Sequence, residues 1–386
     1  MKFAKRMENF GEGIFSRLAA MKQKKISSGA HVFDLSIGAP NIPPPAHVMK
    51  ILAEESLKPE NYVYAITDTR ELLNEAAAWY RRRYGVELDT EEICSLWGSQ
   101  EGLSHLALTL IDEGDLTLVP DPCYPIFADG AKLAGSKIFF IPQLRENDYV
   151  IQLEKIPSDV AARAKFMIVS YPNNPTTAVA PADFYERLIH FAKKNDIVVL
   201  HDNAYSELIF DGTCGLSFLS FDGAKDIGVE FNSLSKTYGF AGARVGFCLG
   251  NREIVRRFKL LKSNIDYGLF LPIQKAAVAA LQSPQEVIDA TRAAYIERRD
   301  ALVDGLNSAG WQIDKPRATM FVWAPVPKKF GTSENFVKLL LEKSSVMMTP
   351  GSAFGPSGEG FVRMALVQTA DTMKKIVAQI QRTIEF

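Results

Sequence analysis

The 386-residue sequence has few cysteines and histidines, and neither residue type is clustered. The four cysteines show no CxxC spacing, and the five histidines are equally dispersed, so the sequence contains no metal-ligand pattern and we expect no metal. Scattered cysteines of this kind are typical of reduced thiols in a cytoplasmic protein. The cysteines are Cys94, Cys123, Cys214 and Cys248.

The sequence also lacks an excess of one charge and any long apolar run. Its 44 basic and 45 acidic side chains nearly cancel, which gives no reason to expect nucleic acid or an anionic membrane as a partner. The basic start at residues 1–6 is followed by no apolar segment of the kind found in signal peptides, and no run approaches the length of a membrane span. The composition, with 47% apolar and 23% charged residues, excludes disorder. We therefore expect a soluble cytoplasmic protein.

Most of the chain alternates between helical patterns and short apolar strands. A chain of this length predicts two domains. Strands are predicted at 93–97, 116–120, 137–141, 166–170, 197–201, 228–232 and 245–249, and helices at 71–83, 181–193 and 252–262. Short β-branched strands that are apolar on both faces favour a large α/β domain, with a mostly parallel sheet covered by helices.

The pattern changes after Pro272. Here we predict helices at 284–308, 333–342 and from Asp371 onward, with strands at 319–324 and 361–365. The first 45 residues contain a short amphipathic piece at 14–18 and a strand-like run at 32–37. These segments are typical of a smaller α+β unit.

The stretch from Phe231 to Gly246 is the strongest candidate for chemistry. Lys236 lies among small and hydroxylated residues, with Ser233 one helical turn before it and Arg244 eight positions after it. A desolvated lysine can lose its proton and attack a carbonyl group. The hydroxyl of Ser233 and the guanidinium of Arg244 suit a phosphate. These residues point to an aldehyde cofactor that carries a phosphate, although a lysine in such a context is more often a solvated surface residue.

Two further segments offer polar groups at the ends of predicted strands. The Gly98-Ser99-Gln100 turn precedes an apolar helix that we expect to open at Leu103, and a helix N-terminus can bind a phosphate. A plain N-cap by Ser99 is the alternative. Asp202 ends an apolar strand, where a carboxylate is costly unless it is paired. A protonated pyridine nitrogen suits it, and a helix cap or a loop ion pair is the alternative.

Three more residues stand in similar places. Arg363 lies in an otherwise apolar strand, so it needs a carboxylate, either from a substrate or from a structural ion pair. Tyr124, in an Asp-Pro turn, and Asn174, in an Asn-Pro turn, also follow predicted strands. Ligands bind at this edge of open α/β sheets. Taken alone, each of these two segments is more typical of an ordinary turn.

The order of these motifs resembles a known family. Ser-x-Ser-Lys-x(5)-Gly-x-Arg-x-Gly, at 233–246, is similar to the lysine motif of class I/II aminotransferases, which are fold-type I enzymes dependent on pyridoxal phosphate (PLP). The wider sequence, from 37 to 363, resembles the branch that contains LL-diaminopimelate and alanine aminotransferases. The resemblance implies a large PLP-binding domain at 46–271, and a small domain made of 1–45 and 272–386.

The resemblance also implies roles for the cofactor-binding residues. Lys236 would hold PLP covalently and transfer the proton of the substrate, Asp202 would pair with the pyridinium, and Tyr205 would hydrogen-bond the ring hydroxyl. Tyr124 would stack on the ring. The phosphate would be held by Ser99, Gln100, Ser233, Arg244 and, from the neighbouring subunit, Tyr64, so the resemblance implies a homodimer with shared active sites.

The substrate-binding residues follow from the same resemblance. Arg363 and Asn174 would bind the α-carboxylate of the amino acid, and the loop at Gly38 would lie over the substrate. The implied reaction moves an amino group between an amino acid and a 2-oxo acid. The alternatives are a β-lyase or decarboxylase on the same scaffold, or a non-catalytic PLP-binding regulator. The chain departs from the family at Thr177 and Thr69, where glycine is usual, and at Asn74, where arginine is usual.

One residue bears on the choice of substrate. Asp266 lies in a region where related enzymes specific for dicarboxylates present an arginine from the partner subunit. A carboxylate there would favour a distal ammonium group, as in LL-diaminopimelate, and repel a second anion. The alternative is that Asp266 is a helix cap or turn residue.

Overall fold

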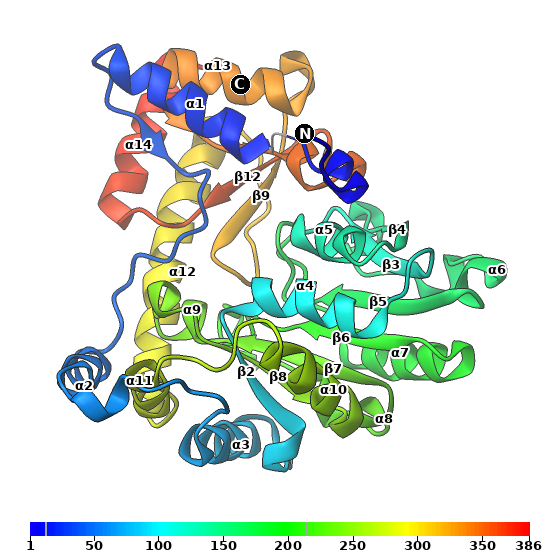
Figure 1. Ribbon diagram of the computed structural model, residues 1–386. Coiled ribbons are helices and arrows are strands. Elements are labelled where there is room, and N and C mark those ends of the chain that lie inside the picture. The colour runs from blue at the N-terminus through cyan, green and yellow to red at the C-terminus, as the bar shows by residue number, and fades with distance from the viewer. Residues whose placement is uncertain (12–13, 214) are drawn as a thin grey trace.

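The computed structural model describes residues 1–11, 14–213 and 215–386. The chain forms one large sheet and two small ones, with helices around them (Figure 1). Cys214 lies outside the described residues. The other three cysteines are buried free thiols, as expected.

The large sheet has seven strands in the order β2-β8-β7-β6-β5-β3-β4. Strands β4, β3, β5, β6 and β7 pair in parallel, while β8 is antiparallel to both β7 and β2. The mostly parallel sheet of the predicted α/β fold is therefore confirmed, with β8 as the exception. Its strands are β2 (Ile93–Leu96), β3 (Leu116–Asp121), β4 (Lys137–Pro142), β5 (Ala164–Ser170), β6 (Val198–Asp202), β7 (Gly228–Ser233) and β8 (Gly246–Gly250).

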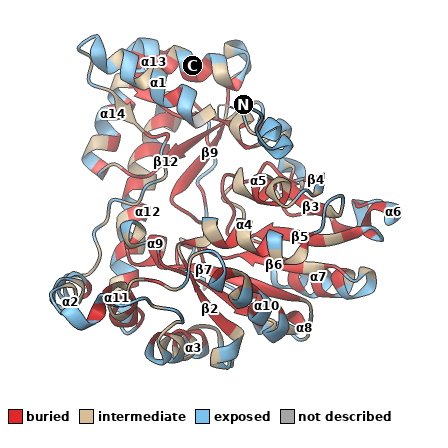
Figure 2. Ribbon diagram, in the orientation of Figure 1, coloured by how far each residue is buried: buried red, intermediate tan, exposed pale blue. Residues whose placement is uncertain are grey.

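Most helices around this sheet carry their buried residues toward it and their exposed residues outward (Figure 2). In α3 (Arg70–Tyr84), the Thr69 hydroxyl accepts a hydrogen bond from the Leu72 amide, and Gly85 ends the helix at φ 67°. Threonine thus caps α3 where the family has glycine. The other helices here are α2 (Ala46–Ser56), α4 (Ser99–Leu110), α5 (Ile126–Leu133), α6 (Ser158–Ala161), α7 (Ala182–Asn195), α8 (Ala224–Ile227), α9 (Leu234–Thr237), α10 (Arg252–Ser263) and α11 (Leu271–Leu281).

The small sheets join the two ends of the chain. Strand β1 (Phe33–Asp34) pairs in parallel with β10 (Val346–Met347), and β12 (Phe361–Ala365) lies between β11 (Thr349–Pro350) and β9 (Phe321–Pro325). The helices of this part are α1 (Ile14–Ser27), α12 (Gln285–Ser308), α13 (Ser333–Ser344) and α14 (Ala370–Thr383). The expected strand at 32–37 is only two residues long, because the Asp34 carboxylate accepts hydrogen bonds from the amide and hydroxyl of Ser36 and turns the chain.

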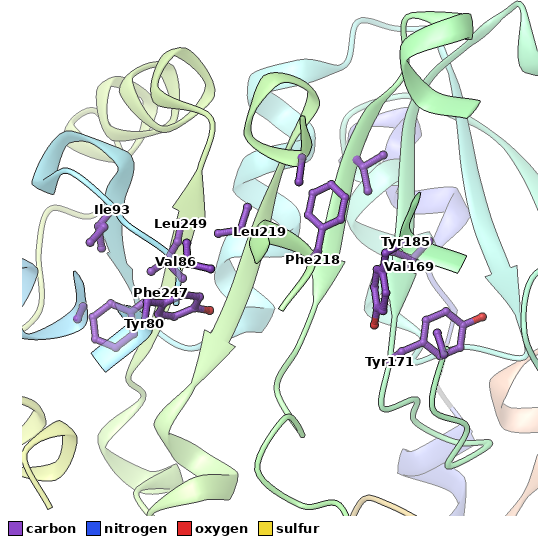
Figure 3. Packing of buried hydrophobic residues seen from close by; sticks show 14 of the residues in the cluster. Tyr80, Val86, Ile93, Val169, Tyr171, Tyr185, Phe218, Leu219, Phe247 and Leu249 are labelled. Carbon is purple, nitrogen blue, oxygen red and sulfur yellow. The ribbon is translucent and has the colours of Figure 1, made fainter. Parts of the chain in front are cut away.

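Buried apolar side chains form separate clusters around the large and the small sheets. Leu18 and Leu35 pack with Met373 and Ile376 of α14, so the N-terminal segment belongs to the cluster of the small sheets. Helix α12 runs between the two regions in Figure 1. Figure 3 shows part of the larger cluster, with Tyr80 and Phe247 on neighbouring elements. In the part of the chain that the structure describes, we find no helix long and apolar enough to span a membrane.

Candidate active site

Lys236 lies in the short helix α9, directly after β7 ends at Ser233. Its Nζ donates a hydrogen bond of 3.2 Å to the carbonyl oxygen of Gly38, in the loop between β1 and α2. Burial lowers the pKa of Lys236 to about 8, and the positive charges of Arg363 and Arg244 act in the same direction. A substantial fraction of this amine is therefore neutral near physiological pH, as a nucleophile or proton carrier requires.

Asp202 ends β6, the strand next to β7. It is buried, and its Oδ1 has no hydrogen-bond partner among the described residues. Burial raises the pKa of Asp202 to about 6, although the charges of His201 and Lys236 oppose the rise. Tyr205, three residues on, places its ring centre 5.9 Å from the Lys236 Nζ. A buried carboxylate oxygen without a partner fits a ring nitrogen that carries a proton.

Of the predicted phosphate-binding residues, Ser99 and Arg244 meet at the start of α4. The helix begins at Ser99 rather than at Leu103, so its free amide groups lie directly after Gly98. A Cβ atom on Gly98 would collide with the Arg244 guanidinium, which shows how closely that cation approaches the turn. The Ser99 hydroxyl has no partner among the described residues, while Ser233 caps α9 through the Ser235 amide at 3.2 Å. A helix start beside a guanidinium group fits a phosphate.

Tyr124 and Gln100 contact each other at the same end of the sheet. The Tyr124 hydroxyl donates a hydrogen bond of 3.0 Å to the Gln100 side-chain oxygen. Gln100 therefore orients the tyrosine and still has its amide nitrogen free to donate elsewhere. A second hydrogen bond fixes the loop that carries Tyr124: the Cys123 amide donates to the Phe354 carbonyl at 2.8 Å.

Arg363 on β12 is buried without a carboxylate partner in the described part of the chain. Its Nη1 donates to the Asn174 side-chain oxygen at 3.0 Å, its Nη2 donates to the Ser36 carbonyl at 2.8 Å, and its Nε has no partner. The guanidinium lies 4.2 Å from the ring centre of Phe321 and 4.6 Å from that of Phe354. Burial lowers the pKa of Arg363 to about 10, so the group stays charged at neutral pH. A buried cation with only neutral partners fits the carboxylate of a ligand.

The Asn174 turn is held by its own side chains. Asn173 accepts hydrogen bonds from the amide and hydroxyl of Thr176, at 3.1 and 2.8 Å. Thr177 has φ 64°, in the left-handed region that favours glycine, and glycine is the residue usual in the family here. The turn is thus kept despite the threonine, and Asn174 still reaches Arg363.

The structure does not bring Tyr64 to the other predicted residues. Its side chain is 84% exposed, and its ring lies against that of Tyr267 at 6.1 Å. Gly268 has a clear reason to be glycine, since a Cβ there would lie 2.7 Å from the Ala65 carbonyl oxygen. The segment around Tyr64 is therefore packed on the segment around Gly268.

Asp266 is already paired within its own chain. Its carboxylate lies 3.1 Å from the Nζ of Lys262, which also contacts Glu101 at 2.8 Å. His105 approaches the same group, so the potential ligand atoms of Glu101, His105 and Asp266 lie within 4.8 Å of one another. Because the Lys262 ammonium contacts two of these carboxylates, the contacts favour a structural role for Asp266 over binding of a distal ammonium group.

Sequence reasoning missed the aromatic side chains around Arg363. Phe321 and Phe354 enclose the guanidinium, and a Cβ on Gly38 would lie 2.6 Å from the Phe321 ring. Phe321 is cross-strand partner to Ala365, two residues beyond Arg363. The strand-like pattern at 319–324 contained Phe321, but nothing in the sequence shows which residue faces it.

These residues fit pyridoxal phosphate. The unpaired Oδ1 of Asp202 suits the ring nitrogen, and the turn at Ser99 suits the phosphate. Lys236, whose charge interacts with those of Asp202 and Arg244, suits the aldehyde. The buried Arg363 lies on the adjoining side, where the carboxylate of an amino acid would bind.

Comparison with known proteins agrees with this interpretation. The family model described as aminotransferase class I and II matches residues 30–380. LL-diaminopimelate aminotransferase of Moorella thermoacetica is 42% identical over 386 residues, which cover 100% of this chain and 99% of the relative. Substrate-bound BacF from Bacillus subtilis has a TM-score of 0.96 at 35% identity, covering 99% and 98% of the two chains. A probable N-succinyldiaminopimelate aminotransferase from Thermus thermophilus has a TM-score of 0.91 at 37% identity, covering 96% and 100%. The chain therefore belongs to the class I and II aminotransferases, and it is a PLP-dependent enzyme of fold type I.

Proposed function

We propose that this aminotransferase uses LL-diaminopimelate, or a closely related amino acid, as donor and a 2-oxo acid as acceptor. The observation that carries the proposal is the 42% identity over the whole chain with an enzyme named for that donor. The site supports an α-amino acid of some kind, since Arg363 and Asn174 together offer a binding site for its carboxylate. The ion pair of Asp266 with Lys262 adds no support for this donor.

The proposed mechanism assigns the proton transfer to Lys236. Bound PLP supplies an aldehyde and a protonated ring that accepts the electron pair of the breaking Cα–H bond. Lys236, whose pKa burial lowers to about 8, takes the proton from Cα as its free amine and returns it as the ammonium. Asp202 would keep the ring nitrogen protonated, Tyr205 would donate a hydrogen bond to the ring hydroxyl, and Tyr124 would stack on the ring.

The remaining site residues are proposed to bind the phosphate of the cofactor and the carboxylate of the substrate. Ser99, Gln100, Ser233 and Arg244 would hold the phosphate of the cofactor. The carbonyl groups of Ser36 and Gly38 contact Arg363 and Lys236 respectively, so the loop between β1 and α2 covers the substrate and excludes water. Replacing Arg363 by lysine should raise KM for the donor, because lysine lacks the bidentate fork. An unchanged KM would exclude Arg363 as the carboxylate site.

The active form is proposed to be a homodimer in which Tyr64 reaches the phosphate of the partner. The segment that carries Tyr64 exposes a run of large apolar side chains, as expected of a surface covered in an assembly. These are Leu57, Tyr62, Val63, Tyr64 and Ile66. Mixing Lys236→Ala with Tyr64→Ala should restore part of the activity if sites are shared, because one site in the mixed dimer keeps both residues. A fully active monomer in sedimentation would refute sharing.

The domain division at 46–271, and at 1–45 with 272–386, is also a proposal. It is supported by the separate apolar clusters, with Leu18 and Leu35 grouped with the C-terminal elements. Helix α11 (Leu271–Leu281) packs in the cluster of the large sheet, so these contacts favour an end of the large domain after Leu281 rather than at residue 271. The cytoplasm remains the predicted location, on the reduced cysteines alone.

A screen of donors tests the proposed substrate. LL-diaminopimelate, aspartate, alanine and N-succinyl-LL-diaminopimelate would each be assayed with 2-oxoglutarate and with pyruvate. We expect the largest kcat/KM for LL-diaminopimelate. Asp266→Ala should leave the ratio of kcat/KM for LL-diaminopimelate to that for aspartate unchanged, because the Asp266 carboxylate is paired with Lys262. A higher kcat/KM for any of the other donors would contradict the proposed donor but not the aminotransferase reaction.

A further inference from the structure

A fully buried pair of ionisable residues, His201 and Glu230, lies directly beside the proposed site and takes no part in the chemistry described above. His201 precedes Asp202 on β6, and it is the ladder partner of Glu230 on β7. Both side chains are 0% exposed. Successive residues of a strand point to opposite faces, so His201 lies on the face of the sheet away from the Asp202 carboxylate.

Four hydrogen-bond donors surround the Glu230 carboxylate. Its Oε1 accepts from the Tyr80 hydroxyl at 2.8 Å and from the Ser217 hydroxyl at 2.9 Å. Its Oε2 accepts from the Phe218 amide at 2.7 Å and lies 2.8 Å from the Nδ1 of His201. Hydrogen bonds donated to a carboxylate favour its charged form, so this site is built for an anion.

The second ring nitrogen of His201 also faces an acceptor. Its Nε2 lies 3.1 Å from the carbonyl oxygen of Tyr171, an atom that can only accept, while the Tyr185 hydroxyl is farther away, at 3.4 Å. Figure 3 shows Tyr171, Tyr185 and Phe218, the aromatic residues of this region. A neutral imidazole has a single N–H group, so two acceptors at these distances require both nitrogens to carry a proton.

We propose that His201 is a buried imidazolium paired with Glu230, and that it is a positioning residue for the aminotransferase reaction. It places a positive charge next to Asp202 on β6, and it holds the Tyr171 end of the turn that presents Asn174 to Arg363. The functional half of this inference rests on the proposed role of Asp202 as partner of the ring nitrogen. The charge state of His201 does not.

The charge has a consequence for Asp202. Burial raises the pKa of that carboxyl, and His201 gives the largest of the opposing effects, ahead of Lys236, while the more distant Glu230 acts weakly in the other direction. The groups that face His201 from its neighbours are the Glu230 carboxylate, the Tyr185 hydroxyl and the Tyr171 carbonyl, with the Phe218 ring at 6.2 Å. Glu230 is the one anion among them, so the imidazolium has a single, close counter-ion.

Nitrogen-15 NMR of the PLP-loaded enzyme labelled at histidine tests the charge directly. The chain has five histidines, and exposed His190 on α7 provides an internal reference signal. We expect one histidine whose two nitrogens both keep the protonated chemical shift from about pH 6 to about pH 9, whereas free histidine loses its proton near pH 6.5. The same signal is expected without PLP. A His201 with one unprotonated nitrogen at pH 7 would overturn the proposal.

A substitution tests the functional half. His201→Gln retains an N–H donor but carries no charge, so the acid limb of the kcat/KM profile should move up by roughly one pH unit while KM for the donor changes little. Tyr185→Phe removes only the distant hydroxyl and should leave the limb in place. An unmoved limb in His201→Gln would overturn the positioning role. If this variant does not fold, the profile can be measured in Glu230→Gln, and the NMR of the unaltered enzyme still decides the charge. Neither readout depends on which amino donor is preferred.

Discussion

The two faces of β6 differ in how their buried polar groups are satisfied. On the proposed cofactor side, Asp202 Oδ1, Ser99 Oγ and Arg363 Nε have no partner among the described residues. On the other side, the Glu230 carboxylate has four donors. An unpaired buried polar atom costs about 1–3 kcal/mol, so the three such atoms among the proposed site residues indicate groups that a ligand would complete. Other atoms of this kind, such as Asn203 Oδ1 and Gln143 Oε1, belong to described residues outside the proposed site. The contrast separates groups kept for binding from groups kept for folding.

The largest effect should come from Lys236→Ala, on the ligand side. Turnover should fall by at least about a thousand-fold, because we find no other amine among the described site residues that could carry the Cα proton. The free energy of unfolding should change little, and non-covalent binding of PLP should persist, since the phosphate site is separate. Steady-state assay measures turnover, PLP absorbance measures cofactor binding, and urea unfolding measures stability. Exposed Lys338→Ala is the control, and near-parent activity in Lys236→Ala would overturn the assignment.

On the folding side, Glu230→Gln should lower the free energy of unfolding by about 3 kcal/mol, because it leaves His201 buried without its anion. Urea unfolding of the PLP-free protein measures this loss, with exposed Glu60→Gln as a control that should be neutral. A loss below about 1 kcal/mol would show that the network is not the structural element that its hydrogen bonds indicate.

Asp202→Asn should raise the free energy of unfolding, whereas Glu230→Gln should lower it. In the PLP-free protein the pKa of Asp202 is raised to about 6 from 3.8, so the folded state binds the proton more tightly and its stability falls as pH rises through this window. Asparagine does not ionise, so the variant does not lose this stability as pH rises. The variant should therefore be more stable than the parent by on the order of 2 kcal/mol at pH 7, and no more stable below about pH 4. Equal stability at pH 7 would contradict the raised pKa, while turnover should fall in either case.

The smallest effect is expected at the Asn174 turn. Thr177→Gly should raise the free energy of unfolding by about 1 kcal/mol, since relief of the φ 64° conformation outweighs the entropy that glycine adds to the unfolded chain. Thermal unfolding measures it. Thr69→Gly, at φ −67°, is the matched control and should be slightly destabilising. Destabilisation at both positions would show that the turn carries no strain.

Much of the fold could be predicted because strands buried on both faces are short apolar runs. All seven strands of the large sheet were predicted to within two residues at each end. Helix α11 was not predicted, because Ala276–Leu281 are all buried and show no polar face to reveal the helical period. The length of β1 depended on a local hydrogen bond from Ser36 to Asp34, which competes with strand pairing.

The candidate site was predictable in its residues but not in its contacts. Lys236, Asp202 and Arg363 were identified by unusual residue types at the ends of, or within, apolar strands. The rings of Phe321 and Phe354 around Arg363 were missed, since one apolar residue in a strand resembles another until its neighbours are known. The role of Tyr64 stays a prediction, because it requires a second chain.

The 24-residue helix α12 also limits how the gene can change. At 1.5 Å per residue it is about 36 Å long, with Ile288 packed in the cluster of the large sheet and Leu302 and Leu306 in that of the small sheets. Deletion of a single codon between these points would rotate everything beyond it by about 100° and shorten the span. We expect insertions and deletions to be excluded from this helix over evolutionary time. A circular permutant whose new termini lie within α12 should fail to fold, whereas a permutant with its new termini in the exposed turn near Gly212 should fold.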